Sequence, residues 1–138
     1  MEFLTDYSHA VTSIVIFTLV LLFMSPFTAL AKQSKGLAPG ATPEQDYADK
    51  AYRLNRAYLN GTETLPAYLT VIVAAILMGA SPFWVNLLAS VALLARLIML
   101  VVHIRGIGKP SAGLRSVLYV IAWACMVVMG IMAIVAAF

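Results

Sequence analysis

Apolar residues gather in four long runs, and polar residues are concentrated in the segments between them. The runs cover about residues 10–31, 63–80, 82–104 and 114–138. About 20 apolar residues in helical conformation cross the ~30 Å hydrocarbon core of a bilayer. None of the runs shows the two-residue alternation of a barrel strand, so lipid-exposed backbone would have to be helical. We predict an all-α integral membrane protein, a single four-helix bundle with up-down topology.

The second membrane helix is expected to begin well before the membrane. The segment KQSKGLAPGATPEQ after the first run is rich in glycine, proline and small polar residues, which is typical of a surface loop. Thr42 is a suitable N-cap, Pro43 suits the first helical position, and acidic residues follow at the positive end of the helix dipole. We therefore predict a cytoplasmic extension from about residue 43 that continues into the membrane-spanning part at about 63–80.

The first run could also be a cleaved signal peptide, because Ala29–Lys32 (ALAK) has small residues at cleavage-site positions. However, no lysine or arginine precedes the run, and it is longer than an ordinary signal sequence core. We expect residues 1–31 to be retained as a membrane helix.

Composition and charge add a membrane orientation. Of the 138 residues, 62% are hydrophobic and 11% are charged, and the net charge is +3. Apart from Arg96, the cations lie in or beside two connecting segments: Lys32, Lys35, Lys50, Arg53 and Arg56 in the first, and Arg105, Lys109 and Arg115 in the second. The positive-inside rule makes both segments cytoplasmic and places both termini on the outer side. Contact with anionic membrane lipids explains most of these charges without nucleic acid. A bacterial inner membrane is the expected host, and an organelle membrane is the alternative.

Polar side chains nevertheless enter the second and third spans. On one continuous helix, Arg53, Arg56, Asn60 and Glu63 fall within an arc of about 80°. Arg96 lies inside the third apolar run and needs an anionic partner there. Glu63 is the only carboxylate near that depth, so we predict that Arg96 and Glu63 approach each other.

The cytoplasmic ends of the last three helices share a set of polar residues. They are Arg56, Asn60, Glu63, His103, Arg115, Ser116 and Tyr119. Together they offer guanidinium groups for carboxylates, a carboxylate for an ammonium group, and amide and hydroxyl groups for a peptide. The natural ligand is a small zwitterionic peptide. The chain has no metal-ligand spacing, glycine-rich phosphate loop or Ser-His-Asp arrangement, and its single cysteine, Cys125, is expected to pack in the fourth helix.

Two stretches carry a resemblance to a known family. The stretch RLNRAYLNGTETLP resembles the R-x-x-R-A-x-x-N-x-x-E-x-x-P motif of the MAPEG family, the membrane-associated proteins in eicosanoid and glutathione metabolism. The stretch ARLIMLVVHIRGIGKPSAGLRSVLYV is similar to the third-helix arginine and fourth-helix R-S-x-x-Y of its prostaglandin E synthase branch. The resemblance implies homotrimers of four-helix subunits that bind glutathione between subunits near the cytoplasmic face.

The resemblance also implies roles for individual residues. By position, the residues that would bind the cosubstrate glutathione are Lys32, Arg56, Asn60, Glu63 and Tyr119. His103 is added to this set because it lies in the same layer, not because the family pattern has a histidine there. The catalytic residues would be Arg115, which stabilises the thiolate, and the adjacent Ser116. Met99 and His103 stand where related enzymes have a histidine and a tyrosine, so a true prostaglandin synthase is not expected.

These observations favour a membrane-bound transferase or peroxidase that uses glutathione and acts on a lipophilic electrophile or hydroperoxide from the bilayer. The alternative is a non-catalytic membrane scaffold, or a lipid- or glutathione-binding protein of the same fold, in which the polar layer holds the helices together. A transporter is not favoured, because the sequence shows no inverted repeat or broken midplane helix.

Overall fold

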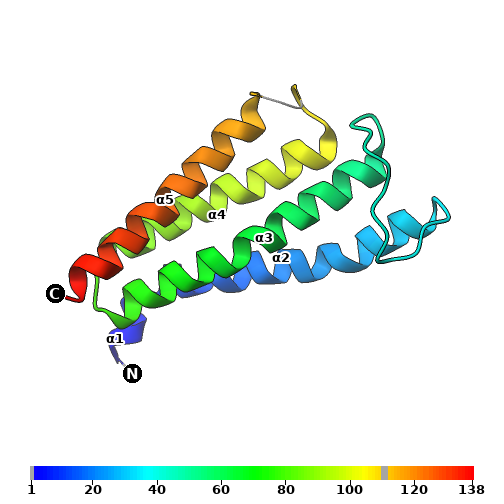
Figure 1. The fold of residues 1–138 in the computed structure, drawn as a ribbon. Helices are drawn as coiled ribbons and strands as arrows, with labels where there is room; N and C mark the ends of the chain where they lie inside the picture. Colours follow the sequence, from blue (N-terminus) through cyan, green and yellow to red (C-terminus); the bar gives the residue numbers. More distant parts are fainter. Residues whose placement is uncertain (1, 110–111) are drawn as a thin grey trace.

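The computed structural model describes residues 2–109 and 112–138, and this part of the chain is all-helical (Figure 1). A short helix, α1 (Glu2–Thr5), is followed by four long ones: α2 (Ser8–Gln33), α3 (Lys50–Leu77), α4 (Pro82–Arg105) and α5 (Leu114–Ala136). All four long helices are long and apolar enough to cross a membrane. Both termini lie at one end of the bundle, and the α2–α3 and α4–α5 connections lie at the other (Figure 1). The predicted all-α fold with four membrane helices is confirmed.

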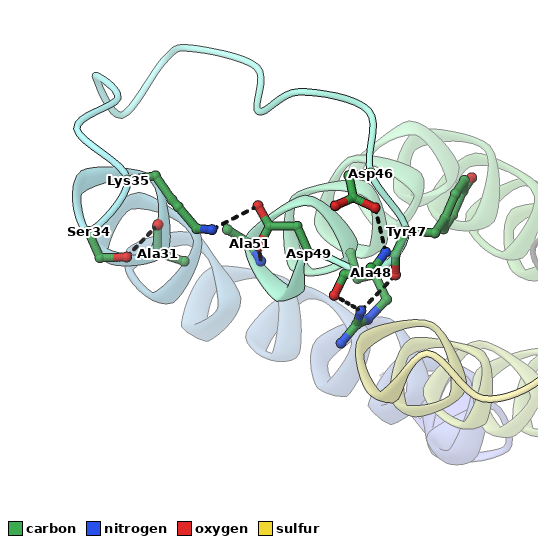
Figure 2. A network of polar contacts seen from close by, with 9 residues as sticks. Ala31, Ser34, Lys35, Asp46, Tyr47, Ala48, Asp49 and Ala51 are labelled. Carbon is green, nitrogen blue, oxygen red and sulfur yellow. Dashed lines mark hydrogen bonds and ion pairs between the residues drawn. The ribbon is translucent and has the colours of Figure 1, made fainter.

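The predicted start of the second long helix at Pro43 is wrong, because α3 begins at Lys50. Asp49 is the N-cap: its backbone is extended, and its carboxylate accepts a hydrogen bond of 2.9 Å from the Ala51 amide. Just before it, the Asp46 carboxylate accepts from the Ala48 amide at 2.8 Å, which stabilises a turn (Figure 2). Aspartate side chains compete with helical hydrogen bonds in this way. The segment from residue 43 to 49 is therefore irregular.

The cap at Asp49 gives a testable dependence of stability on pH. The hydrogen bond from the Ala51 amide, with help from Lys35 at 3.3 Å, holds the pKa of the Asp49 carboxyl below its ordinary 3.8 (Figure 2). A carboxyl group with a lowered pKa stabilises the fold above its ordinary pKa, and this contribution is lost as pH falls through the lowered value. We expect Asp49→Ala to lower the midpoint of thermal unfolding by about 3 °C at pH 7.

Circular dichroism of detergent-solubilised protein at pH 7 and below pH 3.8 would measure the effect. The difference between wild type and Asp49→Ala should shrink at the lower pH. Asp49→Asn keeps a capping oxygen without the charge, so it should lie between the two at pH 7. A difference that stays constant with pH would contradict a role for the ionised carboxylate.

Small residues allow the helices to approach closely, as is common in membrane bundles. Ala57, Ala75, Ala89 and Ala92 are fully buried. Half of the most apolar part of α4 is buried, against 17% for α2, so α4 is the central helix of the bundle. Side chains on its inner face therefore point into the protein and away from lipid, which decides where the polar residues of this span lie.

Arg53 joins the start of α3 to the end of α4. Its Nε donates to the Ile104 carbonyl at 3.1 Å, and its Nη1 donates to the carbonyls of Tyr47 and Ala48 at 2.7 and 2.8 Å. Helix α4 ends at Gly106 in the left-handed conformation, with φ of 68°, which glycine adopts without a steric cost. These contacts hold the segment before α3, including Tyr47, against the C-terminal end of α4.

Candidate functional site

A partly open cavity of about 240 Å³ lies between the N-terminal halves of α3 and α5 and the C-terminal half of α4. It brings together six of the residues that the sequence assigned to a site: Arg56, Asn60, His103, Arg115, Ser116 and Tyr119. They come from three helices and are separated by up to 63 positions in the sequence, and in an antiparallel bundle they reach the same depth. Their geometric convergence is observed, and their functions remain predictions.

Two other predicted residues do not line this cavity. Lys32 is buried at the end of α2, where its ammonium group donates a hydrogen bond of 3.0 Å to the Pro39 carbonyl. Glu63 is exposed on the surface of α3 within the membrane-spanning region. Neither residue lines the cavity of a single chain. They could contact a ligand of this cavity only if a second chain extended the site to them.

The predicted approach of Arg96 to Glu63 is wrong. Arg96 is buried and donates through Nη1 to the Asn60 amide oxygen at 2.7 Å and through Nη2 to the Thr64 hydroxyl. Asn60 and Thr64 are four residues apart and share the face of α3 that packs on α4, whereas Glu63 is rotated by 100° from Thr64. Within residues 2–109 and 112–138 the ion pair found is Lys35–Asp49. Arg96 is therefore held by neutral oxygen atoms.

Arg96 also contacts two residues of the cavity wall, Asn60 and Tyr119. Because the Asn60 oxygen accepts from Arg96, the Asn60 amide NH2 group remains to donate. The Arg96 guanidinium also lies 5.2 Å from the centroid of the Tyr119 ring, within the range of a cation–π contact. Arg96 does not line the cavity itself, but it contacts Asn60 and Tyr119, which do.

Arg115 lies between two rings. Its Nη1 is 3.1 Å from His103 Nε2, and its guanidinium carbon is 5.3 Å from the centroid of the Tyr47 ring. Arginine can only donate, so Nε2 is the acceptor and His103 is neutral with its proton on Nδ1. The Tyr47 and His103 rings stack with centroids 6.4 Å apart. These contacts hold the Arg115 guanidinium at the wall of the cavity.

Sequence reasoning missed three residues of the cavity wall. Tyr47 was assigned to the interior of a helix, although it belongs to the irregular segment before α3. Met99 and Val120 also line the cavity. Met99 precedes His103 by four residues on the same helix face, a spacing that could have identified it. Tyr47 carried no comparable signal, because its position depends on the contacts of Arg53.

An apolar groove adjoins the cavity on the outer face of α5. It is lined by Ala112, Ser116, Val117, Val120 and Ile121. Ser116 and Val120 belong to both the groove and the cavity. The polar cavity is thus continuous with a surface that would face lipid.

Comparison with known proteins agrees with this architecture. The model of the MAPEG family matches residues 10–135, which include nearly all of the four long helices. No match was found among curated proteins.

Proposed function

The chain belongs to the MAPEG family, and from this membership we propose a membrane-bound transferase or peroxidase that binds glutathione in the cavity between α3, α4 and α5. Membership supports a role in glutathione-related or eicosanoid metabolism at a membrane in general. The observation that carries the specific proposal is the position of Arg115, which lines the cavity beside the Tyr47 ring and His103.

The cavity chemistry suits a zwitterionic tripeptide with a thiol. Arg56 can pair with a carboxylate, and the Asn60 amide NH2 group can donate to a peptide carbonyl. Arg115, Ser116 and Tyr119 lie together on the α5 side, where the thiol would be placed. Lowering the pKa of a thiol from ~8.5 to neutrality takes about 2 kcal/mol of preferential interaction with the thiolate. One partly desolvated guanidinium can supply this amount.

We further propose that the site is completed by a neighbouring subunit in a homotrimer. The cavity of about 240 Å³ is smaller than the ~300–1,000 Å³ of usual ligand sites. Glu63 is exposed on a membrane helix, where an uncovered carboxylate is costly. A second subunit packed on this face would cover Glu63 and let it accept from the ammonium group of glutathione. Lys32 could contribute only at such a contact.

The second substrate is proposed to be a lipophilic electrophile or hydroperoxide that arrives from the bilayer. The groove on α5 would hold it, and Ser116 stands where the groove meets the polar cavity. With the two basic connections on the cytoplasmic side, glutathione enters from the cytoplasm of a host for which a bacterial inner membrane is proposed. The two substrates then meet at the cytoplasmic end of α5.

Isothermal titration of the detergent-purified protein with glutathione tests the proposal. Wild type should bind glutathione saturably, and Arg56→Ala should weaken binding at least about tenfold by removing a charge-assisted hydrogen bond. Arg105→Ala is the matched control, since Arg105 is exposed and does not line the cavity. Membranes containing the protein should conjugate chlorodinitrobenzene or reduce an organic hydroperoxide only with glutathione. No saturable binding by wild type would instead support the non-catalytic scaffold.

A further inference from the structure

A second, smaller cavity lies at the cytoplasmic end of α4, and we call it the loop cavity. Its volume of about 90 Å³ has room for about three water molecules. Three cationic side chains line it: Arg53 from α3, Lys109 from the α4–α5 connection and Arg115 from α5. No Asp or Glu is among its lining residues. Three positive charges around one small cavity repel one another unless an anion lies between them.

Several donors at the loop cavity have no acceptor in the described part of the chain. Arg53 uses Nε and Nη1 for three backbone carbonyls, and Nη2 makes no hydrogen bond to residues 2–109 or 112–138. The Lys109 ammonium group likewise has no partner within those residues. His103 lines the loop cavity and is 93% buried, and its Nδ1 has no partner among the described residues. Arg53 is partly buried and Lys109 is exposed, so water can reach them, but His103 Nδ1 is buried. A buried donor without a partner is rare and usually indicates a missing water or ion.

The backbone around the loop cavity is shaped by glycine. Gly106 and Gly108 both have positive φ, 68° and 80°. A Cβ atom at Gly106 would lie 3.0 Å from Arg53 Nε, so a larger residue would displace the guanidinium. The connection therefore folds close to Arg53 and brings Lys109 to the same cavity.

We propose that the loop cavity binds a phosphate-type oxyanion. Arg53 would donate from α3, and Lys109 would donate from the α4–α5 connection. The Arg115–His103 pair would donate from the opposite side of the cavity. Donors from several directions match a tetrahedral oxyanion better than a planar carboxylate. The volume excludes a molecule as large as glutathione. The anion can be free phosphate or the phosphate of a lipid headgroup, because the cavity lies at the cytoplasmic ends of membrane helices.

Thermal unfolding in a maltoside detergent tests this site without glutathione. At constant ionic strength, inorganic phosphate replacing chloride should raise the unfolding midpoint saturably, by about 5 °C or more well above Kd. Lys109→Gln should remove most of this shift, whereas Arg105→Gln should keep it, since Arg105 is nearby but outside the loop cavity. Equal shifts in both variants, or no shift either with inorganic phosphate or with the phospholipids tested next, would overturn the proposal.

A second arm separates the two sources of the anion. The same unfolding experiment is repeated without inorganic phosphate, in mixed micelles that contain phosphatidylglycerol or phosphatidylcholine. A shift with phosphatidylglycerol that Lys109→Gln removes and Arg105→Gln keeps, without a shift from inorganic phosphate, assigns the site to a lipid headgroup. A shift with inorganic phosphate alone assigns it to the free ion.

The loop cavity also borders the candidate glutathione cavity, and this extension rests on the proposed function. Tyr47, His103 and Arg115 line both cavities. An anion in the loop cavity would compete with the thiolate for Arg115, so saturating phosphate should weaken glutathione binding severalfold in wild type and little in Lys109→Gln. Glutathione affinity that phosphate does not change would overturn the competition alone. Absence of glutathione binding would overturn the proposed function and leave the unfolding result intact.

Discussion

Replacing Arg115 with alanine is expected to lower kcat/KM for glutathione-dependent turnover about 30-fold at pH 7. The basis is the loss of about 2 kcal/mol of thiolate stabilisation, the amount that separates a thiol pKa of ~8.5 from neutrality. Arg115 is placed for this role because Tyr47 and His103 hold its guanidinium beside the cavity. Initial rates at low glutathione concentration measure the change.

The pH dependence distinguishes thiolate stabilisation from general damage. In Arg115→Ala, the rate should still rise as pH approaches the ordinary pKa of the glutathione thiol, while the wild-type rate should level off nearer pH 7. Arg115→Lys retains the positive charge but not the planar guanidinium. Its pH profile should lie between those of wild type and Arg115→Ala. Arg105→Ala should match wild type. Equal pH profiles for wild type and Arg115→Ala would remove Arg115 from the mechanism.

The largest effect on stability is expected for Arg96→Ala. Arg96 is 2% exposed, and its removal leaves the Asn60 oxygen and the Thr64 hydroxyl without their donor in the middle of the bundle. Loss of two hydrogen bonds to a charged donor, partly offset by relief from burying that charge, gives a net cost of about 3 kcal/mol. For a chain of this size this corresponds to a fall of about 10 °C in the unfolding midpoint.

Thr64→Val removes only one of the two acceptors and should lower the midpoint less than Arg96→Ala does. Arg105→Ala removes an exposed arginine from the same helix and should leave the midpoint unchanged. Because Arg96 orients the Asn60 amide, Arg96→Met should also weaken glutathione binding even where the protein remains folded. An unchanged midpoint in Arg96→Ala would show that the buried guanidinium contributes nothing net to the fold.

The proposed site would bind two substrates of opposite polarity. In the proposed site, polar groups on α3, α4 and α5 at one end of the bundle would receive glutathione from water, and the groove on α5 would receive an apolar molecule from lipid. Ser116 borders both surfaces. A bundle at a membrane surface can thus bring together two molecules that partition into different phases.

Local errors in the sequence prediction have local causes. Thr42 and Asp49 are both good N-caps, and the choice of Asp49 follows from the turn at Asp46 and from the carbonyl contacts of Arg53. The hydropathy of the segment favours neither cap. Tyr47 was missed because the predicted helix included it. The direction of its side chain was therefore inferred from helical geometry that this segment does not have.

The sequence by itself determined the four membrane spans and the depth of each polar residue, because span length, hydropathy and helical rise are properties of the chain. Depth alone was enough to predict that Arg56, His103 and Arg115 share one layer. Only the tertiary structure decided which side chains meet, since partners depend on the rotation of each helix about its axis. Glu63 and Thr64 are 100° apart around the axis of α3. Thr64 and Asn60 therefore face Arg96 and accept its hydrogen bonds, whereas Glu63 is exposed.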